Sequence, residues 1–478
     1  MSRLVFVLLS STLVGFFGTS AAVYAQSNNE SDMCAALQAL QARVDALEKR
    51  TGPGELPQAA PAARTSTEIL CPPAAPAPAG AGAAPGPTPS PVVGGIFPGS
   101  FILPGTNTSI GFHGFVDLQT FYDPDQYLGD KFQVGLIIPN GNLQRQTQGT
   151  WHFQGKLTRF TIESLTPTKS GDFRTYFSSD FYGYEQGGDT GPQALQNQNY
   201  SLRLREAYGT YHGFLAGKTW SNFEDDPDTM DSLDQSGPAG VPAQLVLQLR
   251  YTRPLKFGRL SFSAENPATD YADNLASTDV ELASPYNPTP DFTGNYNVQS
   301  KLGHFQVSGV IRDLAYDDGK GHRSSASAGG GIAGGTINLG PKSAFGGQTW
   351  FGDGIMKFSP DDFGPVSSAQ INNIGTPQQT LLPSNMHGYA LYALHIFSPV
   401  IRTNFGYGFN FMNWYAFIPA DDSQPVTTKT THANIIWSPL PQIDIGLEYQ
   451  RGWKAFRDSL QLPETFAQRI EGGFKYKF

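Results

Sequence analysis

The side chains in this sequence with the clearest chemistry are arginines at alternate positions of extended segments. Arg203 and Arg205 are two residues apart, so a β-strand would place both guanidinium groups on one face. A guanidinium group offers a planar set of hydrogen-bond donors that suits carboxylates. The same alternation places further charged side chains on polar strand faces: Arg159, Arg174, Arg250, Arg312, Arg402 and Arg469, with Asp117, Asp180, Glu265, Glu448 and Glu471.

Two roles are open for these arginines. A row of arginines along a narrow, wet wall attracts small anions and lowers the barrier to their entry. Alternatively, the arginines pair with the carboxylates on the same faces and only brace the wall. The sequence therefore favours small anionic or polar solutes as partners and leaves bracing as the alternative.

The strands that carry these residues have one apolar and one polar face. Leu247, Leu249 and Tyr251 alternate with Gln248 and Arg250. The same alternation recurs in residues 112–119, 401–411 and 443–450. A charged side chain at the middle of a bilayer costs about 2–4 kcal/mol, whereas a wet lumen removes most of that cost. We therefore expect the apolar faces to meet outer-membrane lipid and the polar faces to line a water-filled lumen.

Two kinds of connection separate the predicted strands. Short turns rich in Pro, Gly and Lys lie at residues 166–171, 253–258, 301–303, 340–342, 398–400 and 438–441. Long polar connections lie between them, as in residues 226–242 and 361–385. Short turns at one end and long loops at the other are typical of bacterial outer-membrane barrels. We predict an all-β fold, a closed antiparallel barrel of about 16 strands over residues 107–478, which is large enough to leave an aqueous channel.

The last predicted strand ends on an aromatic residue. Phe474, Tyr476 and Phe478 alternate with small or charged residues. In outer-membrane barrels the aromatic face of such a strand meets the lipid interface. We expect the barrel-assembly machinery of the outer membrane to recognise this strand through Phe478.

The start of the sequence predicts export. Arg3 precedes an apolar run over residues 4–17, and Val23 and Ala25 form an A-x-A-like cleavage site. We expect a signal peptide over residues 1–25, with a retained anchor helix as the alternative. No later segment has the roughly 18 consecutive apolar residues that a transmembrane helix requires. Insertion into the outer membrane of a Gram-negative bacterium would therefore be by a barrel.

Residues 26–51 predict a periplasmic helix with a coiled-coil seam. Apolar residues recur along it at steps of four and three: Met33, Leu37, Leu40, Val44 and Leu47. A seam this short is not stable as an isolated pair of helices. The seam contributes to assembly only where other contacts already hold copies of this chain together. We expect a homotrimer. A lone amphipathic helix is the alternative.

The segment between this helix and the barrel has a distinct composition. Residues 52–106 are rich in Pro, Ala and Gly and predict a semi-rigid spacer. Cys34 and Cys71 leave open either a disulfide or two unpaired thiols, and their spacing fits no metal site. The net charge of −9 and the pI of 5.4 give no indication of nucleic-acid binding. We expect no cofactor.

An acidic stretch follows about the fifth predicted strand. Its carboxylates lie at Glu224, Asp225, Asp226, Asp228, Asp231 and Asp234. We predict that residues 221–242 fold inward as a constriction loop, where carboxylates opposite wall arginines would set a transverse field. An acidic solvent loop and a divalent-cation site at the outer surface are the alternatives, although the carboxylate spacing does not match an EF-hand.

Several segments together resemble the DcaP-like outer-membrane porins of Gram-negative bacteria. They are GFHGFVD (111–117), LRLREAY (202–208), AGKTWSNF (216–223), DQSGPAG (234–240) and ENP (265–267). The leader, the coiled-coil seam and the Pro-rich spacer also match the layout of that family. The resemblance implies a sixteen-stranded homotrimer with a periplasmic N-terminal coiled coil that passes small anions such as dicarboxylates. It also implies that Arg203 and Arg205 are wall arginines and that residues 224–240 form the constriction loop.

Three functions remain to be compared. The leading expectation is a passive diffusion channel with no catalysis. An outer-membrane enzyme, such as a phospholipase or protease, would need a nucleophile beside an oriented His, or paired acids. The eight His of the sequence are scattered, with none in such a context. A structural tether, whose coiled coil and spacer reach toward the cell wall, is compatible with a channel.

Overall fold

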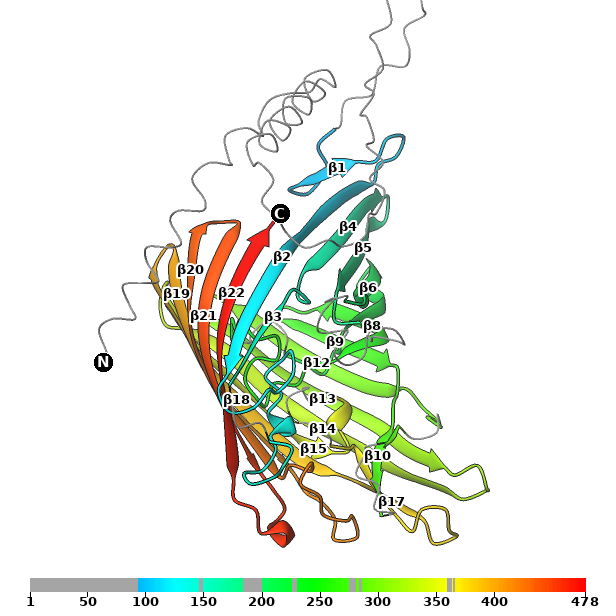
Figure 1. Cartoon of the computed structure of the whole chain (residues 1–478). Coiled ribbons are helices and arrows are strands. Elements are labelled where there is room, and N and C mark those ends of the chain that lie inside the picture. Colours follow the sequence, from blue (N-terminus) through cyan, green and yellow to red (C-terminus); the bar gives the residue numbers. More distant parts are fainter. Residues whose placement is uncertain are drawn as a thin grey trace, which may run out of the picture. The chain divides into compact units, whose positions relative to one another are not determined.

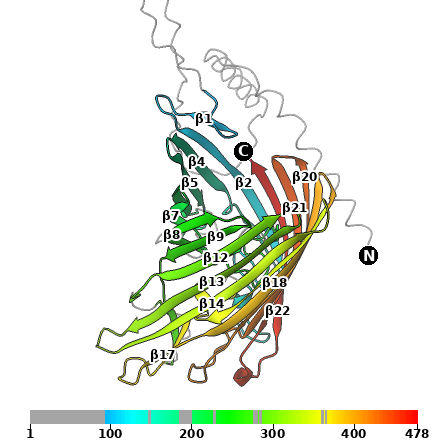
Figure 2. The ribbon, with the colours of Figure 1, turned by 180° about the vertical axis from the view of Figure 1, so that it is seen from behind.

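The computed structural model describes residues 93–145, 149–183, 200–225, 230–274, 281–282, 286–358, 363 and 366–478. The predicted signal peptide, the seam from Met33 to Leu47 and most of the predicted spacer lie outside these residues, as do Cys34, Cys71, Asp226 and Asp228. The described chain forms an antiparallel β-barrel, which Figures 1 and 2 show from opposite sides.

The strands of the cylinder follow one another around it in chain order. They are β2 (Ser109–Asp123), β3 (Thr150–Gln154), β4 (Arg159–Thr168), β5 (Gly171–Asp180), β6 (Arg203–Tyr211), β7 (Phe214–Trp220), β8 (Leu245–Pro254), β9 (Arg259–Glu265), β12 (Asp291–Ser300), β13 (Gly303–Asp317), β14 (Arg323–Asn338), β15 (Ser343–Asp353), β18 (Asn385–Ser398), β19 (Ile401–Met412), β20 (Thr427–Leu440), β21 (Ile443–Ala455) and β22 (Thr465–Lys477).

The cylinder closes between its first and last strands. β2 pairs with β22 on one edge, and β3 and β4 pair with successive parts of β2 on the other. β3 and β4 therefore act as one interrupted strand. The sheet has 18 strands within the described residues, and β1 (Ser100–Ile102) pairs with β2 outside the cylinder. The cylinder thus has 16 strands, which confirms the predicted closed barrel and its size.

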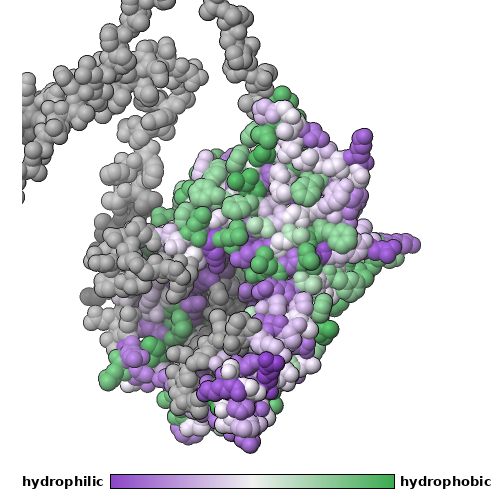
Figure 3. All heavy atoms as spheres, turned by 90° about the vertical axis from the view of Figure 1, so that its right-hand side faces the viewer, coloured by the Kyte–Doolittle hydropathy of each residue, from purple (hydrophilic) through white to green (hydrophobic). Residues whose placement is uncertain are grey.

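The two faces of the strands differ as the alternation predicts. Leu247 and Leu249 are 58% and 67% exposed on the outer wall, whereas Gln248 between them is 5% exposed and faces the lumen. Figure 3 shows a broad hydrophobic area on the outer surface, with hydrophilic residues gathered below it. The outer wall therefore presents apolar side chains where a bilayer would meet it.

The short turns share one end of the cylinder because neighbouring strands run in opposite directions. The predicted turns join β4 to β5, β8 to β9, β12 to β13, β14 to β15, β18 to β19 and β20 to β21. One further turn, between β6 and β7, was not predicted from the sequence. His212 (φ 51°) and Gly213 (φ 83°) form it in the left-handed region, a common arrangement in tight hairpins, without a Pro or Lys to signal it.

Two segments hold more secondary structure than the sequence indicates. Residues 93–106, which composition assigns to the spacer, include β1, which pairs with the start of β2. The long connection over residues 361–385 contains β16 (Ala369–Asn372) and β17 (Thr380–Pro383). These strands form a second, small sheet with β10 (Asp270–Asp273) and β11 (Glu281–Leu282). Within the described residues, short 3₁₀ turns also lie in loops, at Val134–Leu136, Met356–Phe358 and Asp458–Leu460.

One side of the lumen is filled by an apolar core. Its wall residues are Val310, Ile332, Trp350, Met386 and Met412, which face inward from β13 to β19. They pack against loop residues that include Phe223, Phe358 and Trp414. The alternation of apolar and polar faces fails here because loops fold inside the barrel and bury the inner face. In the described part of the chain, no helix has the length and apolar character needed to span a membrane.

Candidate channel constriction

The loop that leaves β7 and returns to β8 crosses the lumen to the opposite wall. We call residues 221–244 the constriction loop. The Leu233 amide donates to Glu448 Oε2 of β21 at 2.7 Å, and the Ala239 amide donates to Thr430 Oγ1 of β20 at 2.7 Å. Trp350 Nε1 of β15 donates to the Gly240 carbonyl at 3.1 Å. The loop is therefore fixed by its backbone at several strands.

Glycines on the opposite wall make room for this loop. Gly406, Gly408 and Gly446 occupy inward positions of β19 and β21. A Cβ at Gly408 would meet the backbone of Ala239, and a Cβ at Gly446 would meet Leu233 Cδ2 at 2.6 Å. Only a wall without side chains at these positions accepts the loop at this distance. These three glycines, here the glycine seat, were not predicted as a contact for the loop, although glycines alternate with aromatic residues throughout residues 405–409.

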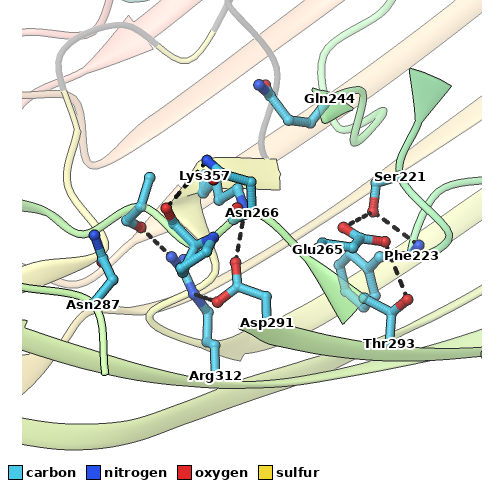
Figure 4. Close-up of polar contacts among 12 residues, drawn as sticks. Ser221, Phe223, Gln244, Glu265, Asn266, Asn287, Asp291, Thr293, Arg312 and Lys357 are labelled. Atoms are coloured by element: carbon cyan, nitrogen blue, oxygen red, sulfur yellow. Dashed lines mark hydrogen bonds and ion pairs between the residues drawn. The ribbon is translucent and has the colours of Figure 1, made fainter. Parts of the chain in front are cut away.

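Glu265 fixes the start of the loop. Its carboxylate accepts a hydrogen bond from Ser221 Oγ at 2.8 Å (Figure 4) and another from the Asn222 amide at 2.9 Å. Ser263 Oγ and Thr293 Oγ1 donate to the same carboxylate at 2.8 and 3.1 Å. Because Glu265 is almost fully buried, it acts as an anchor for the loop and is not open to a solute.

Glu448 anchors the middle of the loop in the same way. Ser232 Oγ donates to it at 2.7 Å, beside the contact from Leu233. His432 Nδ1 lies 2.8 Å from the carboxylate, and Asn434 Nδ2 donates to it at 3.0 Å. Two predicted pore-lining carboxylates, Glu265 and Glu448, therefore hold the loop in place.

Two of the predicted wall arginines are fully buried braces. Arg469 Nε lies 2.7 Å from Asp123 Oδ1, and the second contact to that carboxylate is 2.8 Å. Arg312 Nε lies 3.2 Å from Asp291 Oδ1, and Lys357 Nζ lies 2.7 Å from Oδ2 of the same carboxylate (Figure 4). All four side chains of these two Arg–Asp pairs have an exposure of at most 1%. For Arg312 and Arg469 the bracing alternative therefore describes the structure.

Arg203 and Arg205 share one buried carboxylate. Arg203 Nη2 lies 2.6 Å from Asp180 Oδ2, and Arg205 Nη1 lies 3.3 Å from the same atom. The Gln235 amide of the constriction loop, with its oxygen turned toward the guanidinium groups, accepts from both arginines at 3.1 Å. The two arginines therefore join the wall to the loop, and Arg205 also stacks on the Trp220 ring at 5.2 Å.

Two further predicted arginines, Arg402 and Arg174, differ in their surroundings. Arg402 joins Asp231 of the loop at 2.7 Å to Asp444 at 3.3 Å. Arg174 is 63% exposed near the β4–β5 turn and lies 3.8 Å from Asp172. Arg402 is therefore another contact between wall and loop, whereas Arg174 is far from the constriction in its strand.

The predicted acidic residues of the loop are mostly engaged. Asp225 Oδ1 lies 2.8 Å from His304 Nε2, and burial raises the pKa of the Asp225 carboxyl against the opposing effect of His304. Asp234 accepts from the Phe132 amide at 3.0 Å, and burial raises its pKa as well. Glu224 accepts from the Gln244 amide. Asp117, on the wall, has Lys475 Nζ 3.7 Å away.

Two cavities remain open beside the loop. The first, here the loop chamber, has a volume of about 390 Å³ and is lined largely by the constriction loop, with Arg159, Arg205 and Lys475 on the wall. The second, here the wall chamber, also has about 390 Å³ and is lined by β5–β9, β12 and β13. Trp220 and Glu224 line both chambers. The wall residues of both chambers come from β22 and from β2 to β13, and none comes from β14 to β19, which carry most wall residues of the apolar core.

Three arginines line these chambers without an acidic partner at ion-pair distance among the described residues. Arg159 stacks on the Phe115 ring at 5.2 Å, and its buried Nε has no hydrogen-bond partner. Arg250 Nε donates to Gln248 Oε1 at 2.8 Å, and Arg259 lies only 3.4 Å from the Asn297 amide oxygen. The alternation in the sequence predicted Arg159 and Arg250 in the lumen, whereas Arg259, which follows a predicted turn, was not predicted there.

Comparison with known proteins agrees with this geometry. The family model described as "Porin subfamily" matches residues 93–371. The chain is similar to the outer membrane channel DcaP of Acinetobacter baumannii, at 20% identity over 78% of this chain and 97% of that chain, with a TM-score of 0.63. It is also similar to an anion-selective porin from Comamonas acidovorans, at 9% identity over 78% of this chain and 100% of that chain, with a TM-score of 0.46. None of the curated proteins compared with the chain matches it.

The family match and the fold lead to one assignment. The matched residues cover more than half of the chain, from before β1 into the strand β16. The likeness to DcaP shows the same barrel fold. The chain belongs to the Porin subfamily, and its fold is that of a DcaP-like outer-membrane channel.

Proposed function

We propose that this porin is a passive channel for small hydrophilic solutes that favours small anions, with dicarboxylates among them. The observation that carries the anion preference is Arg159, an arginine of the loop chamber that has no acidic side chain at ion-pair distance among the described residues. Arg205 and Lys475 line the same chamber. A cation held in a narrow, wet passage attracts anions and lowers their entry barrier.

The acidic side chains of the loop chamber offset these cations only in part. Asp225 is held by His304, and Asp234 is buried with backbone amides as its donors. Because burial raises the pKa of both carboxyls, each carries its negative charge less readily than an exposed carboxylate. Asp225 and Asp234 therefore offset the chamber cations less than exposed carboxylates would, and Glu224, the third acid of the lining, accepts from the Gln244 amide.

Reversal potential in planar bilayers tests this proposal. Under a KCl gradient, Arg159→Gln should shift the reversal potential toward cation preference, while Arg253→Gln, a charge change at the β8–β9 turn, should leave it unchanged. A protein without any conductance would refute the channel, and an unshifted potential in Arg159→Gln would refute the anion preference. Arg159 is a sharper target than Arg203 and Arg205, because removing those two also frees Asp180.

The proposal includes assembly as a homotrimer in the outer membrane, with the N-terminal helix in the periplasm. The C-terminal strand supports recognition by the barrel-assembly machinery. Phe478 is 51% exposed, and its backbone exchanges two hydrogen bonds of 3.1 Å with Gly114 of β2.

Deletion of residues 31–91 tests the role of the N-terminal segment and should leave conductance intact. If the trimers then dissociate, the N-terminal segment is an assembly device; if conductance is lost, its proposed role as a separate element is wrong.

A further inference from the structure

We propose that the wall chamber is a binding site for small zwitterions of the α-amino acid class. This inference rests on the proposed channel, because the solute reaches the chamber through the lumen. It differs from the proposed anion preference, which rests on the loop chamber. Three features of the wall chamber carry it: bases on one side and an acid on another strand that have no ion-pair partner among the described residues, and a neutral polar lining between them.

Arg250 and Arg259 form the basic side of the chamber. They come from the neighbouring strands β8 and β9, and neither has a carboxylate within ion-pair distance among the described residues. Arg250 is oriented by Gln248 Oε1 at 2.8 Å and by the Trp220 carbonyl. The acceptors of Arg250 are neutral, so a solute carboxylate in the chamber would meet both guanidinium groups without a competing carboxylate at ion-pair distance among the described residues.

Glu206 of β6 supplies the acidic side. Thr219 Oγ1 donates to Glu206 Oε2 at 2.6 Å, and no cation lies at ion-pair distance from Glu206 within the part of the chain that the structure describes. Glu224 also lines the chamber but is 5% exposed and accepts from the Gln244 amide of the loop. Glu206 is therefore the carboxylate that a solute can contact.

A β-bulge puts Glu206 in this position. Ser178 of β5 pairs with Glu206 and Ser179 with Leu204, so Arg205 has no partner in the ladder. After the extra residue the alternation changes phase, and Glu206 faces inward together with Tyr208. Without the bulge, the alternation would point Glu206 toward lipid, where a charge is costly.

The lining between the charges is neutral and polar. Thr252, Ser261 and Asn295 contribute hydroxyl and amide groups. The chamber volume of about 390 Å³ is in the range of small-molecule sites. A solute with one charge compensates one side and leaves the other to water, whereas an ammonium and a carboxylate on one molecule compensate both. The chamber therefore discriminates by the combination of charges, which a purely anionic site does not.

Solute uptake into vesicles that contain the purified protein tests this inference. The probes are L-alanine, its anionic analogue N-acetyl-L-alanine and its cationic analogue L-alaninamide, each measured by the swelling rate. The variants are Glu206→Gln and the pair Arg250→Gln with Arg259→Gln, with Arg253→Gln on the outward face of β8 as the control. Barrel assembly of each variant is checked by its heat-dependent migration in gels.

The site predicts a specific pattern of rates. Glu206→Gln should lower the L-alanine rate about fivefold, the factor that one partly exposed ion pair supplies, and should leave the N-acetyl-L-alanine rate equal or higher. The arginine pair should lower the rates of both carboxylate solutes. Equal effects of Glu206→Gln on all three probes would overturn the inference, as would no effect on any. No swelling in the unaltered protein would instead refute the channel itself.

Discussion

Arg205 and Glu206 are neighbours in the sequence, yet their side chains line two different chambers of the barrel lumen. The β-bulge opposite Ser178 and Ser179 makes this possible. An extra residue resets the alternation of a strand, so both polar side chains face inward while Leu204 stays on the outer wall. One dipeptide thus supplies a cation to the loop chamber and an anion to the wall chamber.

The glycine seat predicts a wider pore when it is filled. In Gly408→Ala the new Cβ would meet the backbone of Ala239, so the constriction loop must move. We expect a larger single-channel conductance and a loss of about 1–3 kcal/mol of stability, the usual cost of overpacking. The control is Gly294→Ala on the outer wall, where the Cβ would meet only the Phe262 ring at 3.5 Å. Unchanged conductance in Gly408→Ala would show that the loop does not set the pore size.

The alternation of side chains was enough to predict the barrel from the sequence. The alternation of Leu247 and Leu249 with Gln248 indicates which face of the strand meets water, and the predicted turns indicate the number of strands. Alternation predicts a barrel strand because one face of the strand meets lipid and the other meets water. It fails at β13–β19, where loops inside the barrel replace the water that the rule assumes.

The partners of the arginines could not be predicted in this way. Arg469 and Asp123 are 346 residues apart in the sequence and meet because the barrel closes. Alternation says that both face inward but not which inward carboxylate each arginine reaches. Glu206 was missed for a related reason: a bulge changes the phase of a strand, and no residue type in LRLREAY marks it.

The bracing role of Arg469 predicts a large stability cost for its removal. Arg469→Met leaves Asp123 buried and unpaired, which costs about 3–5 kcal/mol. Arg174→Met, at an exposed arginine 3.8 Å from Asp172, should cost less than about 1 kcal/mol. Urea unfolding of the two variants, followed by tryptophan fluorescence, measures the difference. Similar midpoints for both would contradict the distinction between brace and surface arginine.

The buried carboxyl of Asp234 predicts a pH-dependent term in stability. Burial raises the pKa of Asp234 in the folded protein above the ordinary value of 3.8. Between the unfolded and the folded pKa, the folded state therefore binds more protons than the unfolded state. The stability contribution is therefore present at low pH and is lost as the pH rises through the folded pKa. Asp234→Asn keeps an acceptor for the Phe132 amide and removes the titration.

Urea midpoints across a pH series measure this term. The unaltered protein should lose stability relative to Asp234→Asn as the pH rises above 3.8, with the difference levelling off above the folded pKa. Arg469, His432 and Glu448 also act on Asp234, and all three are present in both proteins. A constant difference across the series would mean that Asp234 does not titrate in this range.

The bulge at Arg205 predicts an unusual tolerance to deletion. Removing Arg205 would let Leu204 and Glu206 follow each other in regular alternation against Ser179 and Ser178. Leu204 would stay on the outer wall and Glu206 in the lumen, so we expect the barrel to assemble. Deletion of Ala207 would instead change the phase of the rest of β6 and put Tyr208 on the wrong face, so we expect this control not to assemble.

The two deletions separate the bulge from the charge that it presents. Without Arg205 the loop chamber loses a cation, so the reversal potential should shift toward cations while L-alanine uptake, which depends on Glu206, persists. Arg205→Ala should give the same shift with the bulge intact. If the deletion of Arg205 prevents assembly, as the deletion of Ala207 is expected to, the prediction is wrong. The extra residue of the bulge would then be needed for barrel closure, whatever side chain it carries.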